Sequence, residues 1–159
     1  MIHVRVQPDE FDLGEEMRRL CSGRPSVGAV ASFVGLVRDN NQVAGQASDV
    51  ATMTLEHYPG MTEKALQRIA GQASQRWRLQ GVSIVHRIGA LHPGDPIVLV
   101  LSASRHRQDA FDACQYIMDI LKTEAPFWKK ERLADGSERW VESRESDEES
   151  ASRWDDDGF

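Results

Sequence analysis

Hydrophobic and polar residues follow two different periods along this chain of 159 residues. Short runs that alternate between apolar and polar residues, or that are continuously apolar, predict β-strands, and longer segments with a 3.6-residue period predict helices. The predicted strands cover residues 2–6, 27–34, 50–58, 82–88, 97–103, 127–133 and 138–143. The predicted helices cover residues 12–20, residues 62–77 and a long segment that follows Arg107 and ends before Pro126. This order predicts an α+β fold in which helices pack on a sheet.

Turn and capping residues separate these elements. Asp12 followed by Glu15 is typical of a capping box at a helix start. The Asp135-Gly136 pair between the last two predicted strands is typical of a hairpin turn. Residues 39–48 are polar and have no strong period, which predicts a loop, and the segment 91–96 contains the prolines and glycine of a turn.

Lysine is rare in this chain and is concentrated in one place. The sequence has four lysines and fifteen arginines, and Lys122, Lys129 and Lys130 fall within nine residues. Lysine can release its proton when it is desolvated or crowded by other cations, whereas arginine cannot. The cluster therefore indicates amine chemistry or compact phosphate contacts, and the alternative is a solvated basic edge.

The helical period places Lys122 at the edge of the apolar stripe of the long helix. This position predicts partial desolvation, which would make a neutral amine more accessible. A snorkelling lysine near a helix C-terminus is the alternative. In the strand that follows, Lys129 shares one face with Phe127 and Glu131, whereas Lys130 lies on the other face.

Bases, rather than acids, crowd the start of the long helix. Arg105, His106 and Arg107 stand there although helix N-termini favour negative charge. Together with unpaired backbone N–H groups they form a natural anion site, unless a neighbouring acid pairs with them. Arg38 stands where a core strand gives way to a polar loop, which makes it a ligand contact or an exposed loop arginine.

The acidity of the chain is confined to its C-terminal segment. Residues 145–159 carry seven acids and one base, which accounts for the whole net charge of −6. Residues 1–144 hold eighteen acids and eighteen bases, and a neutral body disfavours general nucleic-acid binding. The polar tail of residues 147–159 is expected to be disordered.

Cysteine and histidine usage indicates neither a disulfide framework nor a metal site. Cys21 and Cys114 lie on helical patterns with apolar neighbours, and His86 and His92 have no metal-ligand spacing. We interpret both histidines as structural. No apolar run is long enough to span a membrane, and the first residues read as a strand rather than a signal peptide. A reducing cytoplasm is the expected setting.

Six sequence blocks resemble the MoaE family, the large, catalytic subunit of molybdopterin synthase. The blocks are GLVR (35–38), LEHYPGMTEKAL (55–66), HRIGALHPGD (86–95), SRHRQDAF (104–111), IMDILKTEAPFWKKE (117–131) and RWVESRES (139–146). The resemblance covers residues 2–146, and the combination of APFWKKE with HYPGMTEKAL is highly specific.

The resemblance implies an α/β-hammerhead fold with an additional antiparallel β subdomain, forming a catalytic domain over residues 1–146. It implies a sulfurtransferase that uses no cofactor and no metal. Two large subunits would form a homodimer at the centre of a heterotetramer, and each would bind a small ubiquitin-like subunit of the MoaD type through its Gly-Gly tail. That tail carries a thiocarboxylate, whose sulfur would go to cyclic pyranopterin monophosphate to form the dithiolene of molybdopterin.

The resemblance also implies roles for individual residues. Lys122 and Lys129 match the catalytic lysines of the family. The positions that bind the pterin phosphate or line the pocket match Arg38, His106, Arg107, Lys130 and Arg144. The family often has lysine where this chain has Leu36, so a role for that side chain is not expected here.

The residues by themselves leave two other functions open. The lysines could form a Schiff base with a carbonyl substrate, or the chain could be a non-catalytic scaffold that captures a ubiquitin-like tail. Neither Cys21 nor Cys114 lies in an electropositive loop that would activate a thiolate. Sulfur chemistry would therefore need sulfur supplied by a partner.

Overall fold

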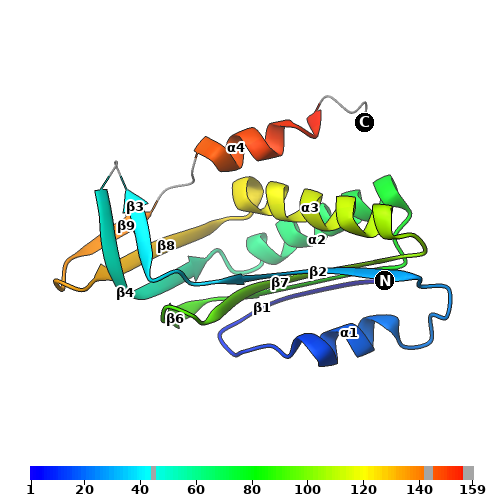
Figure 1. The fold of residues 1–159 in the computed structure, drawn as a ribbon, viewed down its shortest axis with the longest axis horizontal. Coiled ribbons are helices and arrows are strands. Elements are labelled where there is room, and N and C mark those ends of the chain that lie inside the picture. The colour runs from blue at the N-terminus through cyan, green and yellow to red at the C-terminus, as the bar shows by residue number, and fades with distance from the viewer. Residues whose placement is uncertain (44–45, 142–144, 156–159) are drawn as a thin grey trace.

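The computed structural model describes residues 1–43, 46–141 and 145–155. Its strands are β1 (Ile2–Gln7), β2 (Ala29–Leu36), β3 (Asn40–Val43), β4 (Gln46–His57), β5 (Gly81–Arg87), β6 (Gly89–Leu91), β7 (Pro96–Ser104), β8 (Phe127–Leu133) and β9 (Glu138–Val141). Its helices are α1 (Leu13–Cys21), α2 (Met61–Trp77), α3 (Arg107–Glu124) and α4 (Glu145–Ser152). The mixture of helices with mainly antiparallel strands confirms the predicted α+β class (Figure 1).

The first sheet has the strand order β1-β5-β7-β2. β1 pairs with β5 in parallel, and the other two pairs are antiparallel. β7 begins with a continuous apolar run, and the residues of β5 and β7 are buried along nearly the whole of both strands. Strands with this composition are typical of a sheet that is covered on both faces.

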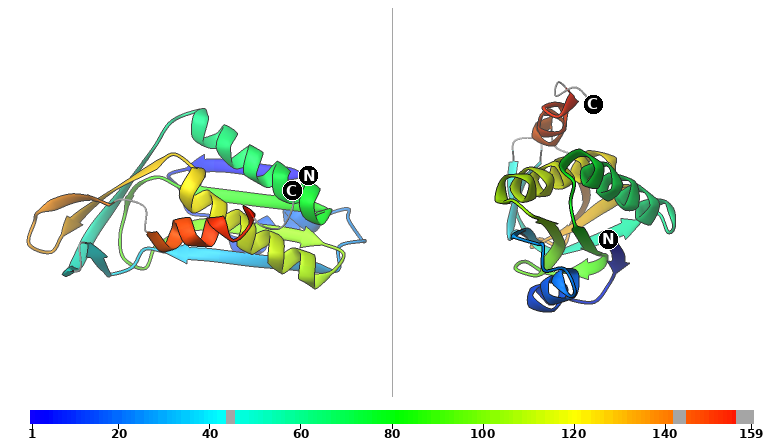
Figure 2. Two further views of the ribbon diagram at one scale, coloured as in Figure 1. Left: turned by 90° about the horizontal axis from the view of Figure 1, so that it is seen from above. Right: turned by 90° about the vertical axis from the view of Figure 1, so that its right-hand side faces the viewer.

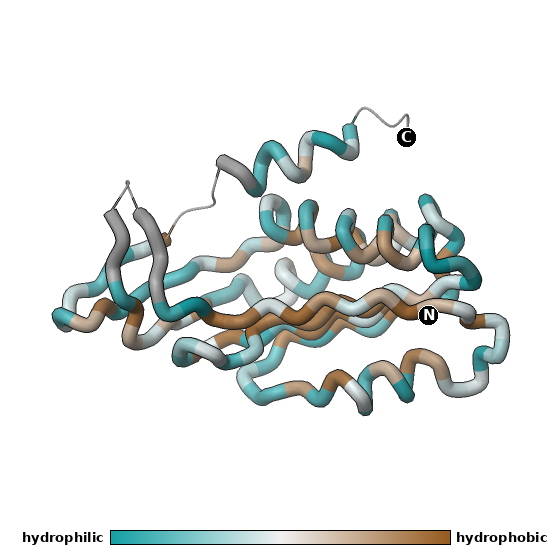
Figure 3. The backbone as a smooth tube through the Cα atoms, viewed as in Figure 1, coloured by the Kyte–Doolittle hydropathy of each residue, from teal (hydrophilic) through white to brown (hydrophobic). Residues whose placement is uncertain are grey.

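Helices cover both faces of the first sheet. α2 and α3 lie on one face and α1 lies on the other (Figures 1 and 2). The larger core lies under α2 and α3 and includes the fully buried Leu66, Val100 and Ile117. A smaller core under α1 includes Leu20 and Leu99. Figure 3 shows the apolar residues gathered along the strands between these helices.

The second sheet has the order β3-β4-β8-β9, and β6 also pairs with β4. β8 follows α3 after a sharp turn at Pro126, because proline cannot continue a helix. The hydroxyl of Thr62 donates a hydrogen bond of 3.0 Å to the Pro126 carbonyl and ties this turn to the start of α2. The turn places Lys122 and Lys129, which are close in sequence, on two different elements at one junction.

The C-terminal segment corrects the prediction of a disordered tail, because residues 145–152 form helix α4. Trp154, just after this helix, packs against the rings of Trp77 and Tyr116 at centroid distances of 5.6 and 5.5 Å. Its indole N–H donates a hydrogen bond of 2.8 Å to Asp119, and the Arg76 guanidinium lies 5.2 Å from its ring centroid. Polar composition predicts disorder only when no aromatic anchor finds a site on the folded body.

We expect Trp154→Ala to release α4 from the body of the protein. The substitution removes the ring contacts and the hydrogen bond to Asp119, and α4 by itself is too short and too polar to stay helical. Hydrogen exchange should become faster for the amides of residues 145–155 and stay unchanged in β7. Phe111→Ala is the matched control, since Phe111 is 63% exposed. Equal protection of α4 in both variants would contradict the anchor.

Two other segments differ from the sequence prediction. The polar segment 39–48 is not a loop, since it forms β3 and the beginning of β4. These strands pair through their backbone groups, which need no apolar period in the sequence. The link after β5 contains the short strand β6, which extends the second sheet from the edge of β4. Across the described residues, we find no helix that combines the length and the apolar character needed to cross a membrane.

Candidate functional site

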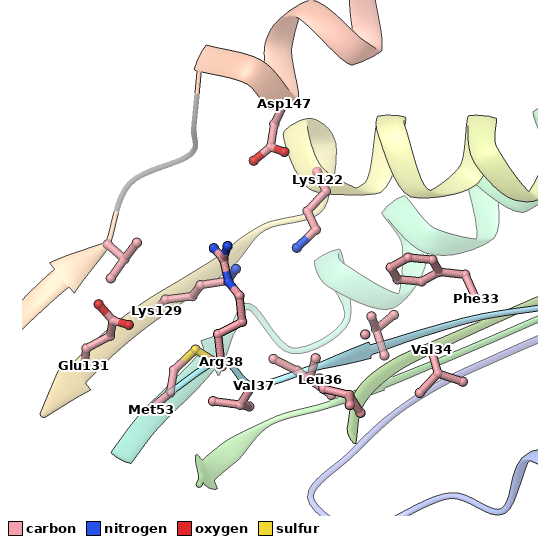
Figure 4. Close-up of a pocket in the computed structure, with 14 residues that line it drawn as sticks. Phe33, Val34, Leu36, Val37, Arg38, Met53, Lys122, Lys129, Glu131 and Asp147 are labelled. Carbon is pink, nitrogen blue, oxygen red and sulfur yellow. The ribbon is translucent and has the colours of Figure 1, made fainter. Parts of the chain in front are cut away.

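A cavity of about 530 Å³ lies where the end of α3 meets both sheets (Figure 4). Its apolar wall comes from the end of β2, from β7 and from Met53 of β4. Its charged side chains come from four different parts of the chain and are Arg38, Lys122, Lys129, Glu131 and Asp147.

Arg38 reaches this cavity because the backbone next to it is held in place. Val37 is buried, and its N–H donates a hydrogen bond of 2.9 Å to the Asp95 carbonyl. The N–H of Gly94 donates a second one of 2.7 Å to the Val37 carbonyl. The arginine that follows is exposed, and its guanidinium points toward Lys129 (Figure 4).

Lys122 and Lys129 direct their amines into the same cavity from the last turn of α3 and from β8 (Figure 4). Burial, together with the positive charges of Lys122 and Arg38, lowers the pKa of Lys129 to about 8, although Asp147 acts in the opposite direction. An amine with this pKa exchanges its proton readily near neutral pH.

The structure corrects one expectation about the two lysines. Lys122 was predicted to be partly desolvated, but its side chain is exposed at the mouth of the cavity. The desolvated amine is that of Lys129, whose side chain lies in the cavity among residues from α3, α4 and the end of β2. The exposed Lys122 agrees with the alternative of a snorkelling lysine near the end of the helix, and the helix stripe carried no information on Lys129.

Glu131 completes the floor of the cavity and is only 2% exposed. Its carboxylate accepts a hydrogen bond of 3.1 Å from Nε of Arg139, which lies opposite it in the β8–β9 pair. Lys129 and Glu131 both line this cavity, which confirms that they share one face of β8.

A second cavity of about 500 Å³ shares Lys122, Lys129, Val141 and Asp147 with the first. Its other walls are mostly apolar or aromatic and comprise Leu121, Thr123, Ala125, Phe127, Trp128, Trp140 and His86. Trp128 and Trp140 are about half exposed, at 48% and 54%. The two lysines thus stand between a cavity with an arginine and a cavity with aromatic walls.

Other residues implied by the resemblance lie elsewhere in the single chain. Lys130 points to the opposite side of β8, where it forms a 2.9 Å ion pair with Glu138. His106 and Arg107 stand at the start of α3, about 22 Å from Lys122 at 1.5 Å per helical residue. Arg144 lies outside the described residues. The structure therefore brings together Arg38, Lys122 and Lys129, and within the single chain it does not bring Lys130, His106 or Arg107 to them.

Three residues of the two cavities were not singled out for the site from the sequence. His86 was interpreted as structural, Glu131 was named only for its strand face, and Asp147 was assigned to the tail. Each reaches the site through strand pairing or the docking of α4, which no local pattern reports.

We expect Asp147→Asn to lower the pKa of Lys129 below about 8. The Asp147 carboxylate favours the charged form of Lys129, so its removal leaves burial and the neighbouring cations unopposed. An NMR titration that follows the side-chain signals of Lys129 measures the change. Glu149→Gln on the same helix is the control, because Glu149 is exposed and this substitution removes the same amount of negative charge. A midpoint that rises in Asp147→Asn would contradict the assignment.

Comparisons with known proteins give one consistent result. The family model described as MoaE protein matches residues 6–124. The molybdopterin synthase catalytic subunit of Pseudomonas aeruginosa is 56% identical over 153 residues, which cover 96% of this chain and 99% of that protein. The MoaE structure from Burkholderia ambifaria is 51% identical, with a TM-score of 0.81 over 98% of this chain and 99% of that chain.

A more distant structure agrees with these relatives. Molybdopterin synthase from Staphylococcus aureus is 30% identical, with a TM-score of 0.76 over 86% of this chain and 95% of that chain. Among the described residues, no group of three or more His, Cys, Asp or Glu is placed to hold a metal ion. The family match, the identity over nearly the full length and the shared fold show that this chain belongs to the MoaE family.

Proposed function

We propose that this chain is the catalytic subunit of a molybdopterin synthase, a sulfurtransferase of molybdenum cofactor biosynthesis. It takes sulfur from the C-terminal thiocarboxylate of a small ubiquitin-like subunit of the MoaD type. The acceptor is cyclic pyranopterin monophosphate, which receives two sulfurs to form the dithiolene of molybdopterin. The observation that carries this proposal is the convergence of Arg38, Lys122 and Lys129 on two joined cavities.

The cysteines support a source of sulfur outside the chain. Cys114 is buried in α3, and burial raises the pKa of its thiol to about 11, so little thiolate exists at neutral pH. Cys21 ends α1, which covers the sheet face opposite α3. Neither thiol lines the cavities that hold the lysines. The thiocarboxylate of a partner supplies what the chain lacks.

The environments of the three bases suggest different roles. Arg38 is exposed and permanently charged, and it binds the phosphate of the substrate. Lys122 meets the incoming thiocarboxylate and stabilises the negative charge on it during transfer. Lys129 moves protons, since its pKa of about 8 lets both protonation states exist near neutral pH. Each thiocarboxylate sulfur bonds to a pterin carbon, and water then cleaves the bond between that sulfur and the carbonyl carbon of the tail, so that the tail leaves as a carboxylate.

His106 and Arg107 join this site only through a second copy of the chain. β2 is an edge strand of the first sheet and exposes Phe33 and Leu36, and α3 exposes Phe111. Apolar side chains on an exposed edge support a homodimer, which would form the centre of a heterotetramer. For Lys130 and Arg144, a role in the pocket or at the phosphate rests on the resemblance alone, since Lys130 pairs with Glu138 on the other side of β8.

Reconstitution tests the proposal directly. The purified chain is mixed with a thiocarboxylated small subunit and cyclic pyranopterin monophosphate, and dithiolene formation is measured. We expect two sulfurs to be transferred for each pterin. Borohydride trapping of a substrate adduct without the small subunit would instead favour a Schiff-base enzyme. Binding of the tail without turnover would favour a scaffold.

In the cell we place the reaction in the cytoplasm, where both cysteines stay reduced.

A further inference from the structure

His86 is a buried side chain that lines the aromatic cavity beside Lys122 and Lys129. It is 6% exposed, and its ring stacks on Phe127 with a centroid distance of 3.8 Å and an interplanar angle of 22°. β5 fixes its backbone between β1 and β7. The imidazole therefore has a fixed position next to the amines of the proposed site.

The hydrogen bonds of His86 determine which nitrogen carries its proton. Nδ1 lies 2.8 Å from the Arg87 carbonyl oxygen, and because a carbonyl can only accept, Nδ1 must donate. In the neutral ring Nε2 then carries a lone pair. Among the described residues Nε2 has no hydrogen-bond partner, and the residue faces the cavity. Because His86 lines the cavity, a ligand bound there can supply a donor to this lone pair.

The charge state of His86 supports the same role. Burial, together with the charges of Lys122, Lys129 and His57, lowers its pKa to about 3, although the hydrogen bond to Arg87 acts in the opposite direction. The ring is thus neutral throughout the physiological range and cannot act as an acid there. What it offers to a ligand is one hydrogen-bond acceptor.

The aromatic cavity suits the tail of the small subunit better than the phosphate-bearing pterin. Its mouth carries the half-exposed Trp128 and Trp140, and exposed aromatic residues are enriched where protein partners bind. Arg38, which suits a phosphate, lines the other cavity and not this one. His86, both tryptophans and both lysines line this one cavity, so a peptide bound in it can contact His86 and the lysines together.

A Gly-Gly tail can be recognised only through its backbone, because it has no side chains. Its carbonyl oxygens and its thiocarboxylate can accept from lysines, but its N–H groups need an acceptor. Asp147 also carries acceptor oxygens in this cavity, but its charge repels a thiocarboxylate close by. The uncharged Nε2 of His86 has no such penalty.

We propose that Nε2 of His86 accepts a hydrogen bond from a backbone N–H of the Gly-Gly tail and so positions the thiocarboxylate at Lys122 and Lys129. This inference rests on the proposed function and adds to it a residue that recognises the sulfur donor. It does not involve His86 in proton transfer. Because His86 contacts only the sulfur donor, its substitution should leave the binding of the pterin unchanged.

The test combines a change in the protein with a change in the tail. His86→Phe removes the acceptor and keeps a ring that can stack on Phe127. Small subunits with an ester in place of one of the last two peptide bonds lack one N–H each. With the wild-type chain, one of these esters should raise the KM for the small subunit about tenfold, the effect of one lost hydrogen bond. The kcat should stay within about twofold.

In His86→Phe, the KM for the normal small subunit should rise about tenfold, and the ester that affects the wild type should have no further effect. His86→Gln offers another acceptor and should recover part of the loss. The KM for the pterin should not change. If His86→Phe does not fold, the ester-containing small subunits can still be tested with the wild-type chain. The proposal is overturned if neither ester changes the KM for the small subunit.

Three other outcomes separate this inference from the function on which it rests. A KM that rises for the pterin instead of the small subunit would assign the N–H donor to the pterin and overturn the inference. Normal kinetics of His86→Phe with both substrates would overturn it as well, while wild-type turnover leaves the proposed function intact. Failure of the wild-type chain to form any dithiolene would instead refute the proposed function.

Discussion

Replacing Lys122 with alanine should lower the rate of sulfur transfer by at least about a thousandfold, the size of effect expected when a charged group at the reacting centre is removed. The variant should fold normally, because Lys122 is exposed and its helix is held by the buried Ile117 and Leu121. The loss should appear in kcat and in kcat/KM together if the amine acts mainly in the transition state. Dithiolene formation in single-turnover mixtures measures it.

Lys64→Ala is the control for this experiment. Lys64 is the one lysine of the chain outside the cluster, and it is exposed on α2. Its removal changes the net charge equally but should leave the rate unchanged. Lys122→Ala should also raise the pKa of Lys129, because the charge of Lys122 lowers that pKa in the wild type. Wild-type rates in Lys122→Ala would exclude this lysine from the chemistry.

Replacing Gly28 with alanine should destabilise the protein by about 3 kcal/mol, at the upper end of the usual cost of overpacking. Gly28 donates its N–H to the Ser104 carbonyl at 3.0 Å, and a Cβ at this position would lie 2.2 Å from the Arg105 carbonyl oxygen. That oxygen belongs to the backbone and cannot rotate away. The start of β2 would have to move away from the segment that leads into α3. Urea unfolding measures the loss.

Gly71→Ala is the matched control, with an effect of the opposite sign. Gly71 lies inside α2, and no atom would come within 4 Å of its added Cβ. Alanine stabilises a helix interior by roughly 0.5–1 kcal/mol relative to glycine. The two variants make the same chemical change, so the difference between their urea midpoints isolates the close approach at Gly28. Similar midpoints would contradict the packing described here.

Periodic segments were predictable because their signal is local. The apolar stripes of α2 and α3 and the continuous apolar run of β7 each reflect burial along a single element. Segments that depend on partners were not predictable. β3 forms by backbone pairing with β4 and needs no apolar period. α4 is followed by Trp154, which packs against Trp77 and Tyr116 in the folded chain.

The candidate site divides in the same way. The scarcity of lysine indicated where amines gather, and the alternation along β8 correctly separated Lys129 from Lys130. The burial of Lys129 could not be read from the sequence pattern, because it depends on which distant segments line the cavity around its side chain. The role of His86 could not be predicted from the sequence either. Its tautomer depends on the hydrogen bond to the Arg87 carbonyl, and the cavity that it lines depends on the turn after α3.

The sequence alone determined the class of fold, the lysine-rich junction after the long helix and the resemblance to the MoaE family. Each of these depends only on local hydrophobic periods or on contiguous motifs. Tertiary structure alone decided which charges meet: Arg38, Lys129 and Asp147 belong to distant parts of the chain, whereas His106 and Arg107 share a helix with Lys122 but lie at its other end. Distance along a chain does not fix distance in space, since strand pairing and helix docking are set by interactions between segments.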